Sequence, residues 1–414
     1  MACAVLLMLI RTTRGQRNLT SPYVDTRQHC QHHHLRVTEK SWIIGENAIN
    51  GLCNQILGIF SYVPVAILWD VNLVVGEMFS RSSFEAAASN LENWKRVPFS
   101  TFFDWAHFSR FWLQHGLRTM EFHEYLQHNN CSFNNQSTVV TIVKDPSFWP
   151  VKNSILMEML AKSSVPFPIP PNKVLKLDDE HSKFTALFNY WKGGLKHKLL
   201  LLKVHNSLRP SPAVSRVLHA LVDELPADFV CVHVRLEADY LLFKKLSFDK
   251  ELPAALAHIR SHKCFRSDPW ASNSSRSLPI FVASGLFSGG VGSTSNIDSS
   301  AARAQSLLRG LGELGFSEVY TRQSLIDRVM RDAGKRSIQG IVDDFDLLPE
   351  VGAMVDLLIS RHERCSCFVD SHQSSSFSYM AQRLRQMDGG QVLKYTEITP
   401  ELFGVSEEFK QWGV

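Results

Sequence analysis

The chain has 414 residues, of which 44% are hydrophobic and 20% are charged, and its formal net charge at pH 7 is +4. This length exceeds the roughly 250–300 residues that a single hydrophobic core usually supports, so we expect two folded domains. A net charge this small, without a dense basic stripe, argues against nucleic acid as the main partner.

The first ten residues are apolar, and Arg11 ends the run. Ten residues cannot span a bilayer, which needs about 20. The run could be the h-region of a signal peptide or the remainder of a signal anchor, although the positive n-region and a cleavage site are missing. Sequons at Asn18, Asn130, Asn135 and Asn273 agree with the secretory pathway. We expect a lumenal protein of the endoplasmic reticulum or Golgi, with an ordinary N-terminus as the alternative.

Residues 1–40 are expected to form a targeting and stem segment, because residues 11–40 are polar. The eight cysteines are compatible with disulfides in an oxidising lumen, but their pairing cannot be read from the sequence. Cys53 and Cys231 stand in apolar segments, which predicts buried thiols. The closely spaced Cys365 and Cys367 do not have the spacing of a zinc knuckle.

The first domain is predicted to span residues 41–205. A strand at 42–44, a glycine-containing loop at 45–55, a helix to about 68 and a strand at 70–75 make a βαβ unit. Its loop opens a helix N-terminus, where anions are favoured, but the glycines do not form GxGxxG. Further along we expect mostly helix at 79–126, a strand at 138–143, a helix at 153–162, a proline-rich loop at 165–172, and a strand or helix end at 199–204.

The second domain is predicted to span residues 206–395, followed by a tail at 396–414. Strands are expected at 229–235, 278–283, 318–321 and 367–370, alternating with helices at 211–225, 253–262, 301–314, 349–360 and 375–385. This alternation is typical of a mostly parallel sheet with helices on both faces. The predicted fold class is therefore α/β, with two facing Rossmann-like domains and a cleft between them.

Polar residues follow the ends of several strands. The apolar run that begins at Phe229 turns polar at His233 and Arg235, where an open α/β sheet binds its ligands. The planar guanidinium of Arg235 matches phosphate oxygens, although a surface ion pair is the alternative. Ser375 and Ser376 stand at a predicted helix start, where hydroxyls and free N–H groups could cradle a phosphate or simply cap the helix.

These segments together resemble the GDP-fucose protein O-fucosyltransferase superfamily, including its plant and algal branch. Residues 51–55 (GLCNQ) resemble the N-terminal glycine/Asn-Gln motif, with an additional Cys53, and residues 233–239 (HVRLEAD) resemble the His-x-Arg motif. Residues 281–285 (FVASG) resemble the strand before the sugar-nucleotide loop, without an aspartate that some members have. Residues 375–378 (SSFS) match the Ser-Ser-Phe motif. The resemblance covers roughly residues 42–390.

The resemblance implies a GT-B fold and a metal-independent, cofactor-free, inverting transfer of fucose from GDP-fucose to a hydroxyl of a protein or glycan. It implies that Arg235 binds the β-phosphate and stabilises the departing GDP. The remaining implied donor-binding residues are His233, Asn54, Asp239, Ser284, Ser375, Ser376 and Phe377.

An inverting transfer can also use a base that removes the proton of the acceptor hydroxyl. The candidates are Glu46, Glu237 and Asp239, and Glu46 is favoured because it belongs to the predicted acceptor-side domain. Three alternatives stay open: a non-catalytic sugar-nucleotide or glycan-binding protein, a transferase for another nucleotide sugar, and a metal-dependent enzyme that uses residues 344–346 (DFD). The acidic residues of that last motif are equally typical of a helix start.

Overall fold

The computed structural model describes residues 40–45, 51–81, 94–129, 137–141, 169, 174–178, 195–237, 240–242, 245–265, 279–287, 297–316, 318–331, 349–371 and 375–388. The expected targeting segment, the helix at 153–162, the motif at 344–346 and the tail lie outside these residues. Among the candidate site residues, Glu46 and Asp239 also lie outside them.

The first sheet has five parallel strands in the order β5-β2-β1-β7-β6. They are β1 (Trp42–Gly45), β2 (Asn72–Val75), β5 (Thr119–Glu121), β6 (Ser137–Thr141) and β7 (Val174–Asp178). Helix α2 (Leu52–Leu68) packs on the face that carries Ile43 and Leu73, and α4 (Phe122–Asn129) packs on the face that carries Ile44 and Val74. The βαβ unit predicted at the start of this domain is confirmed.

Between residues 79 and 126, the prediction of mostly helix is wrong at three of the described segments, which are strands. Strand β3 (Met78–Arg81) pairs antiparallel with β4 (Trp94–Val97), and η3 (Phe99–Thr101), α3 (Trp105–Gln114), β5 and α4 follow. Phe and Trp are also common in strands, so a composition rich in these residues does not distinguish a strand from a helix. The ambiguous run at 199–204 lies inside helix α7 (Leu195–Ser207).

The second sheet is also parallel, in the order β10-β9-β8-β11. Its strands are β8 (Phe229–His233), β9 (Ile280–Ala283), β10 (Val319–Thr321) and β11 (Cys365–Asp370). All five residues of β8 are buried, as its uncharged run predicted. Val230 and Val232 belong to a core cluster with α10 (Phe248–Ser261) and α11 (Ile297–Glu313), whereas Phe229 and Cys231 belong to the cluster on the other face.

The second face of this sheet is covered by α8 (Pro212–Asp223), α12 (Arg322–Arg331) and α14 (Pro349–Arg361). Helix α8 begins where the sequence predicts, because the Ser211 hydroxyl accepts the N–H of Val214 and Pro212 fits the first helical position. Helix α12 was not anticipated, and a short 3-10 turn, η6 (Gly285–Phe287), follows β9.

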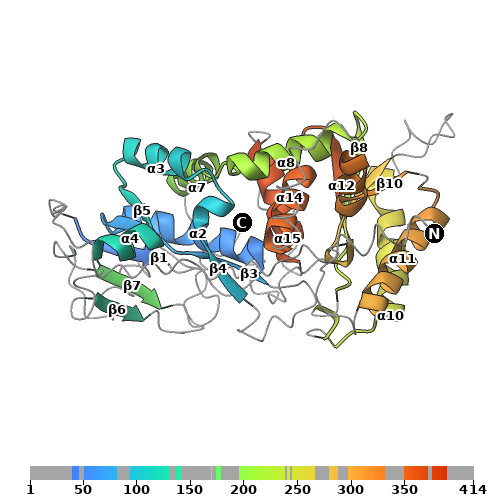
Figure 1. The fold of residues 1–414 in the computed structure, drawn as a ribbon, viewed down its shortest axis with the longest axis horizontal. Helices are drawn as coiled ribbons and strands as arrows, with labels where there is room; N and C mark the ends of the chain where they lie inside the picture. Colours follow the sequence, from blue (N-terminus) through green and yellow to red (C-terminus); the bar gives the residue numbers. More distant parts are fainter. Residues whose placement is uncertain are drawn as a thin grey trace, which may run out of the picture.

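The last described helix, α15 (Ser376–Asp388), packs against α14 of the second half and against α2 and α7 of the first. Figure 1 shows the two sheets toward opposite ends of the long axis, with α14 and α15 between them. The predicted α/β fold class, with two mostly parallel sheets and a cleft that both halves line, is confirmed.

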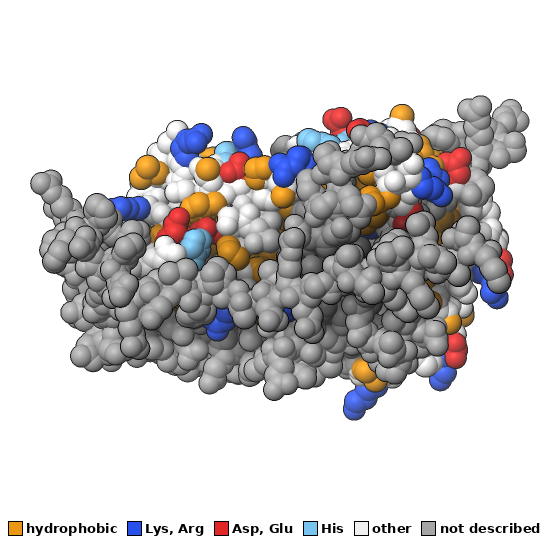
Figure 2. All heavy atoms as spheres, in the orientation of Figure 1, with side chains coloured by type: hydrophobic (Ala, Val, Ile, Leu, Met, Phe, Trp, Pro, Cys, Tyr) orange, Lys and Arg blue, Asp and Glu red, His pale blue; other side chains and the backbone are white. Residues whose placement is uncertain are grey.

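No helix among the described residues is long and apolar enough to cross a membrane. On the face seen in Figure 2, the described side chains of Lys and Arg are interspersed with acidic and hydrophobic ones. This part of the surface therefore carries mixed charge.

Candidate active site

A cleft with about 590 Å³ of empty space, including the part that is open to solvent, is lined by both halves of the chain. The first half contributes Gly51, Leu52, Cys53 and Arg81, and the second contributes His233, Arg235, Glu237, Ala283, Ser284, Gly285, Ala353, Asp356 and Phe377. The four segments that the sequence singled out thus each contribute to one cleft.

Strand register explains why segments far apart in sequence meet here. His233 lies beside Ala283 of β9 on one side and beside Asp370 of β11 on the other. Since the three strands are parallel, their carboxyl ends lie at the same edge of the sheet. The start of α2, which follows β1 of the other sheet, completes the lining.

Arg235 lies two residues beyond β8, and its side chain is 30% exposed. Its Nε lies 3.9 Å from Glu237 Oε2, and its guanidinium carbon lies 5.4 Å from the ring centroid of Tyr240. Burial raises the pKa of Cys53 to about 12, and the charge of Arg235 opposes this rise. The guanidinium therefore acts across the cleft on the first turn of α2, while the Cys53 thiol stays neutral.

The N-terminus of α2 borders the cleft through Gly51, Leu52 and Cys53. Gly51 is its N-cap and supplies no side-chain hydrogen bond, and the first turn contains no acidic residue. The first N–H groups of a helix have no acceptor inside it, and the helix dipole adds positive potential there. Asn54, an implied donor contact, lies half-buried on this turn but is not part of the cleft lining. The arrangement favours an anion between the helix start and Arg235.

Glu237 ties two of the strand ends together. Its Oε1 accepts the Gly285 N–H at 2.6 Å and the Ser284 hydroxyl at 3.4 Å. A Cβ at position 285 would lie 2.8 Å from the same oxygen, so this approach requires glycine. These contacts position the carboxylate beside Arg235; its role as a catalytic base, and that of Ser284 in donor binding, stay predictions.

The C-terminal motif begins helix α15 at Ser376, as predicted. Ser375 is 2% exposed, and within the described part of the chain its hydroxyl has no hydrogen-bonding partner. The Phe377 ring stacks on the His233 ring, with 4.5 Å between centroids and an interplanar angle of 18°. One face of Phe377 is therefore already covered, which leaves at most the other for a ligand.

Two charged residues of the cleft were missed by the sequence analysis. The first is Asp356 of α14, whose Oδ2 accepts a hydrogen bond from Arg322 Nη1 at 3.0 Å. No described residue donates a hydrogen bond to its Oδ1. Burial raises its pKa to about 6, and the Arg322 charge opposes this rise. An aspartate inside the apolar run of this helix was a usable signal, because carboxylates are rarely fully buried without a partner.

Arg81, at the end of β3, is the second missed residue. Its Nε donates to Glu350 Oε1 at 2.7 Å, and its guanidinium lies 5.6 Å from the Trp94 ring centroid. No local pattern could have indicated its place in the cleft, since its carboxylate partner is 269 residues away.

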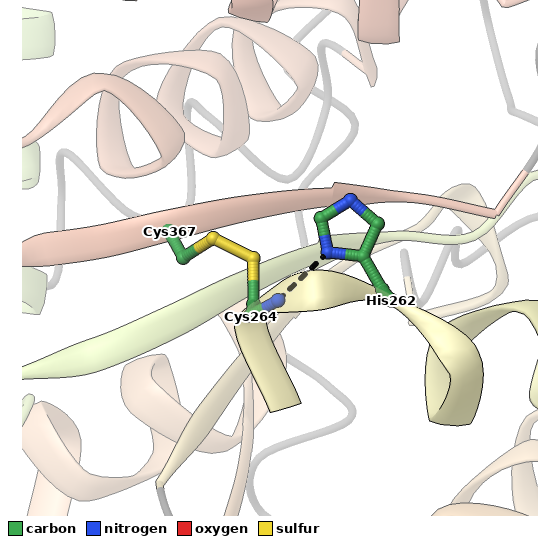
Figure 3. A group of neighbouring side chains, drawn as sticks. All are labelled: His262, Cys264 and Cys367. Carbon is green, nitrogen blue, oxygen red and sulfur yellow. Dashed lines mark hydrogen bonds between the residues drawn. A yellow bond between two sulfur atoms is a disulfide. The ribbon is translucent and has the colours of Figure 1, made fainter. Parts of the chain in front are cut away.

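A separate cluster joins His262, Cys264 and Cys367, whose candidate metal-ligand atoms lie within 4.8 Å of one another. Figure 3 shows that the two sulfur atoms are joined as a disulfide and that His262 Nδ1 faces the Cys264 backbone nitrogen, at 3.3 Å. Bonded sulfurs are not thiolate ligands, so this form of the cluster is a crosslink between the 3-10 turn η5 (Lys263–Phe265), which follows α10, and β11. Cys53 and Cys231 are free and buried, as predicted.

No protein-family model matches the sequence, and no curated protein matches it. Among solved structures, the chain is similar to POFUT1 in complex with GDP-fucose, with 12% identity, a TM-score of 0.44, and coverage of 84% of this chain and 95% of that one. It is also similar to NodZ alpha-1,6-fucosyltransferase co-crystallised with GDP, with 15% identity, a TM-score of 0.43, and coverage of 84% and 93%. For fucosyltransferase NodZ from Bradyrhizobium, the identity is 15%, the TM-score 0.42, and the coverage 84% and 94%. Both NodZ structures are described as fucosyltransferases, and the POFUT1 structure contains GDP-fucose.

Proposed function

We propose that this chain is an inverting, metal-independent glycosyltransferase that moves fucose from GDP-fucose to a hydroxyl of a protein or glycan. The observation that carries the proposal is the cleft itself, which is lined both by Arg235 of the second half and by the first residues of α2, whose N-cap is a glycine, in the first half. A diphosphate is the ligand that this pair of positive groups suits. The choice of fucose and guanosine rests on the resemblance of the motifs.

The chemistry follows from the charge that develops in the reaction. Breaking the bond between sugar and phosphate leaves an oxocarbenium-like sugar and adds negative charge to the leaving GDP. Fixed donors aimed at developing charge are usually the largest catalytic contribution. Arg235 is held beside Glu237 and over Tyr240, so it would meet that charge without reorganising. His233 and the start of α15 would hold the nucleotide from the same sheet edge.

The site of action proposed is the lumen of the endoplasmic reticulum or Golgi. The Cys264–Cys367 disulfide supports this, because disulfides persist in oxidising compartments and are rare in the cytosol. The acceptor would be a glycoprotein or glycan, which the lumen supplies.

The test measures binding and hydrolysis of GDP-fucose by the purified, disulfide-bonded chain, alongside a thermal-shift panel of other nucleotide sugars. Arg235→Ala should lower turnover by about 10²–10³-fold, the usual cost of losing a donor to developing charge. Arg235→Lys should retain part of the activity, since it keeps the charge but not the fork. The matched control is Arg260→Ala, which removes an exposed arginine of α10 and should change nothing.

Near wild-type turnover of Arg235→Ala would overturn the assignment of this residue. Tight donor binding without hydrolysis or transfer would instead favour a non-catalytic sugar-nucleotide-binding protein. That alternative has one observation behind it: the described carboxylates of the cleft, Glu237 and Asp356, are both engaged by neighbouring groups. Activity that is lost in excess EDTA would contradict the metal-independent reaction.

A further inference from the structure

Three hydrogen-bonded polar residues, His233, Ser378 and Asp370, lie behind the cleft. Their geometry determines the protonation of His233, which the sequence motifs do not. His233 Nδ1 lies 2.7 Å from the Ser378 hydroxyl oxygen, and that hydroxyl donates to Asp370 Oδ1 at 2.6 Å. The direct distance from His233 Nδ1 to Asp370 Oδ1 is 3.9 Å. The three residues come from β8, α15 and β11, and His233 and Asp370 are cross-strand neighbours.

The single proton of the serine hydroxyl decides the direction of these bonds. An ionised carboxylate can only accept, so Ser378 donates its proton to Asp370. The same oxygen can then only accept from His233, which requires a proton on Nδ1. A neutral imidazole carries one proton, so its Nε2 has none. In free imidazole side chains both tautomers are available; here the serine and aspartate select one.

Packing fixes the orientation of the ring as well as its tautomer. His233 is 4% exposed and Ser378 is fully buried. The stacked Phe377 ring restricts rotation of the imidazole plane. His233 lines the cleft while its Nδ1 edge is bonded to Ser378, so the opposite edge, with Nε2, is the one available to a ligand.

We propose that Ser378 and Asp370 are positioning residues that hold His233 as the Nδ1–H tautomer, so that Nε2 accepts a hydrogen bond from a hydroxyl of the bound nucleotide sugar. This inference rests on the proposed function for the identity of the ligand. An unprotonated Nε2 offers a lone pair, and ionised phosphate has no proton to donate, so among the diphosphate and the two sugars the partner is a hydroxyl. Both the ribose and the transferred sugar carry such groups.

Other charges surround the imidazole. Asp356 of α14 interacts electrostatically with His233 and with Glu237. Arg235 lies two residues after His233 in the sequence. Asp370 in turn interacts with His262 at the end of α10. None of these replaces Ser378 as the contact of Nδ1, so the tautomer depends on that one hydroxyl.

The first experiment reads the tautomer directly and needs no ligand. Nitrogen-15 shifts of histidine side chains distinguish a protonated Nδ1 from a protonated Nε2, and a His233→Gln spectrum assigns the signal. We expect the Nδ1–H form at neutral pH in the wild type and in Ser378→Thr, which keeps the hydroxyl. Ser378→Ala should move His233 to the Nε2–H form. An Nε2–H form in the folded wild type would overturn the proposal.

The second experiment measures the affinity for GDP and for GDP-fucose. Ser378→Ala should weaken binding by about tenfold, the value of one hydrogen bond to a ligand, and Ser378→Thr should restore it. A loss for both ligands assigns the contact to the ribose, and a loss for GDP-fucose alone assigns it to the sugar. Ser306→Ala, which removes a hydroxyl bonded to a backbone carbonyl of α11, is the matched control.

Unchanged affinity of Ser378→Ala for both ligands would refute the role of Nε2 in binding. If the wild type binds neither ligand while the Nδ1–H form is observed, the proposed function fails and the tautomer selection stands. The two failures are therefore distinguishable.

Discussion

The carboxylate of Glu350 should be a major link between the two halves of the chain. It lies in the first turn of α14, and its side chain is fully buried. It accepts the Arg81 Nε at 2.7 Å, the Arg81 backbone N–H at 2.7 Å and the Ser80 hydroxyl at 3.0 Å. All three donors belong to the last two residues of strand β3 in the first half. One carboxylate of the second half therefore accepts all three of these hydrogen bonds.

Glu350→Ala should destabilise the protein by about 3–5 kcal/mol, because it removes the ion-pair partner of the Arg81 guanidinium, whose side chain is 11% exposed. For a chain of 414 residues that corresponds to a fall of roughly 3–6 °C in Tm. Glu350→Gln should cost less, since it keeps the shape and some hydrogen bonds while removing the charge. Arg81 lines the cleft, so GDP-fucose affinity should fall together with stability.

The assay is urea unfolding followed by circular dichroism, with a double-mutant cycle against Arg81→Met to isolate the pair. Glu363→Gln, which changes an exposed carboxylate just beyond α14, should stay within about 0.5 kcal/mol of the wild type. A Glu350→Ala protein that loses less than about 1 kcal/mol, the usual effect of a surface change, would refute the reasoning.

Two further outcomes follow from the geometry. Burial raises the pKa of Asp356 from 3.8 to about 6, so the folded state holds its proton more tightly than the unfolded state does. The free energy of unfolding should therefore fall as pH rises through this interval, and urea unfolding of Asp356→Asn should show a flatter pH dependence there; an unchanged slope would contradict the shift. The Cys264–Cys367 bond closes a separation of 103 residues, so replacing both cysteines by serine should cost about 3–5 kcal/mol. Equal stability of the wild type with and without reductant would show that the bond contributes nothing.

Much of the fold was predictable because its signals are local. The uncharged run of β8 predicts a strand buried on both faces, and Ser211 followed by Pro212 marks the start of α8. Helix α15 begins at Ser376, inside the serine run that precedes Phe377. Such signals depend on side-chain spacing and on hydrogen bonds within a few residues, so they can be recognised from the sequence alone.

The candidate site was predictable only where it follows a strand. His233, Arg235 and Ser284 could be placed at a sheet edge, because the end of each buried run is visible in the sequence. The position of Arg81 and the antiparallel pairing of β3 with β4 could not be predicted. The aromatic residues near Arg81 in the sequence show no hydrophobic periodicity that distinguishes a strand from a helix.

What the sequence by itself determined is the alternation of strands and helices and the polar groups at the strand ends, since each of these depends on neighbours along the chain. The tertiary structure decided which distant groups meet: Glu350 with Arg81, Cys264 with Cys367, and Ser378 with His233. The physical reason is that buried charges and hydroxyls take their partners from whatever the packing of helices and sheets brings within hydrogen-bonding distance, and that packing is fixed by the whole core.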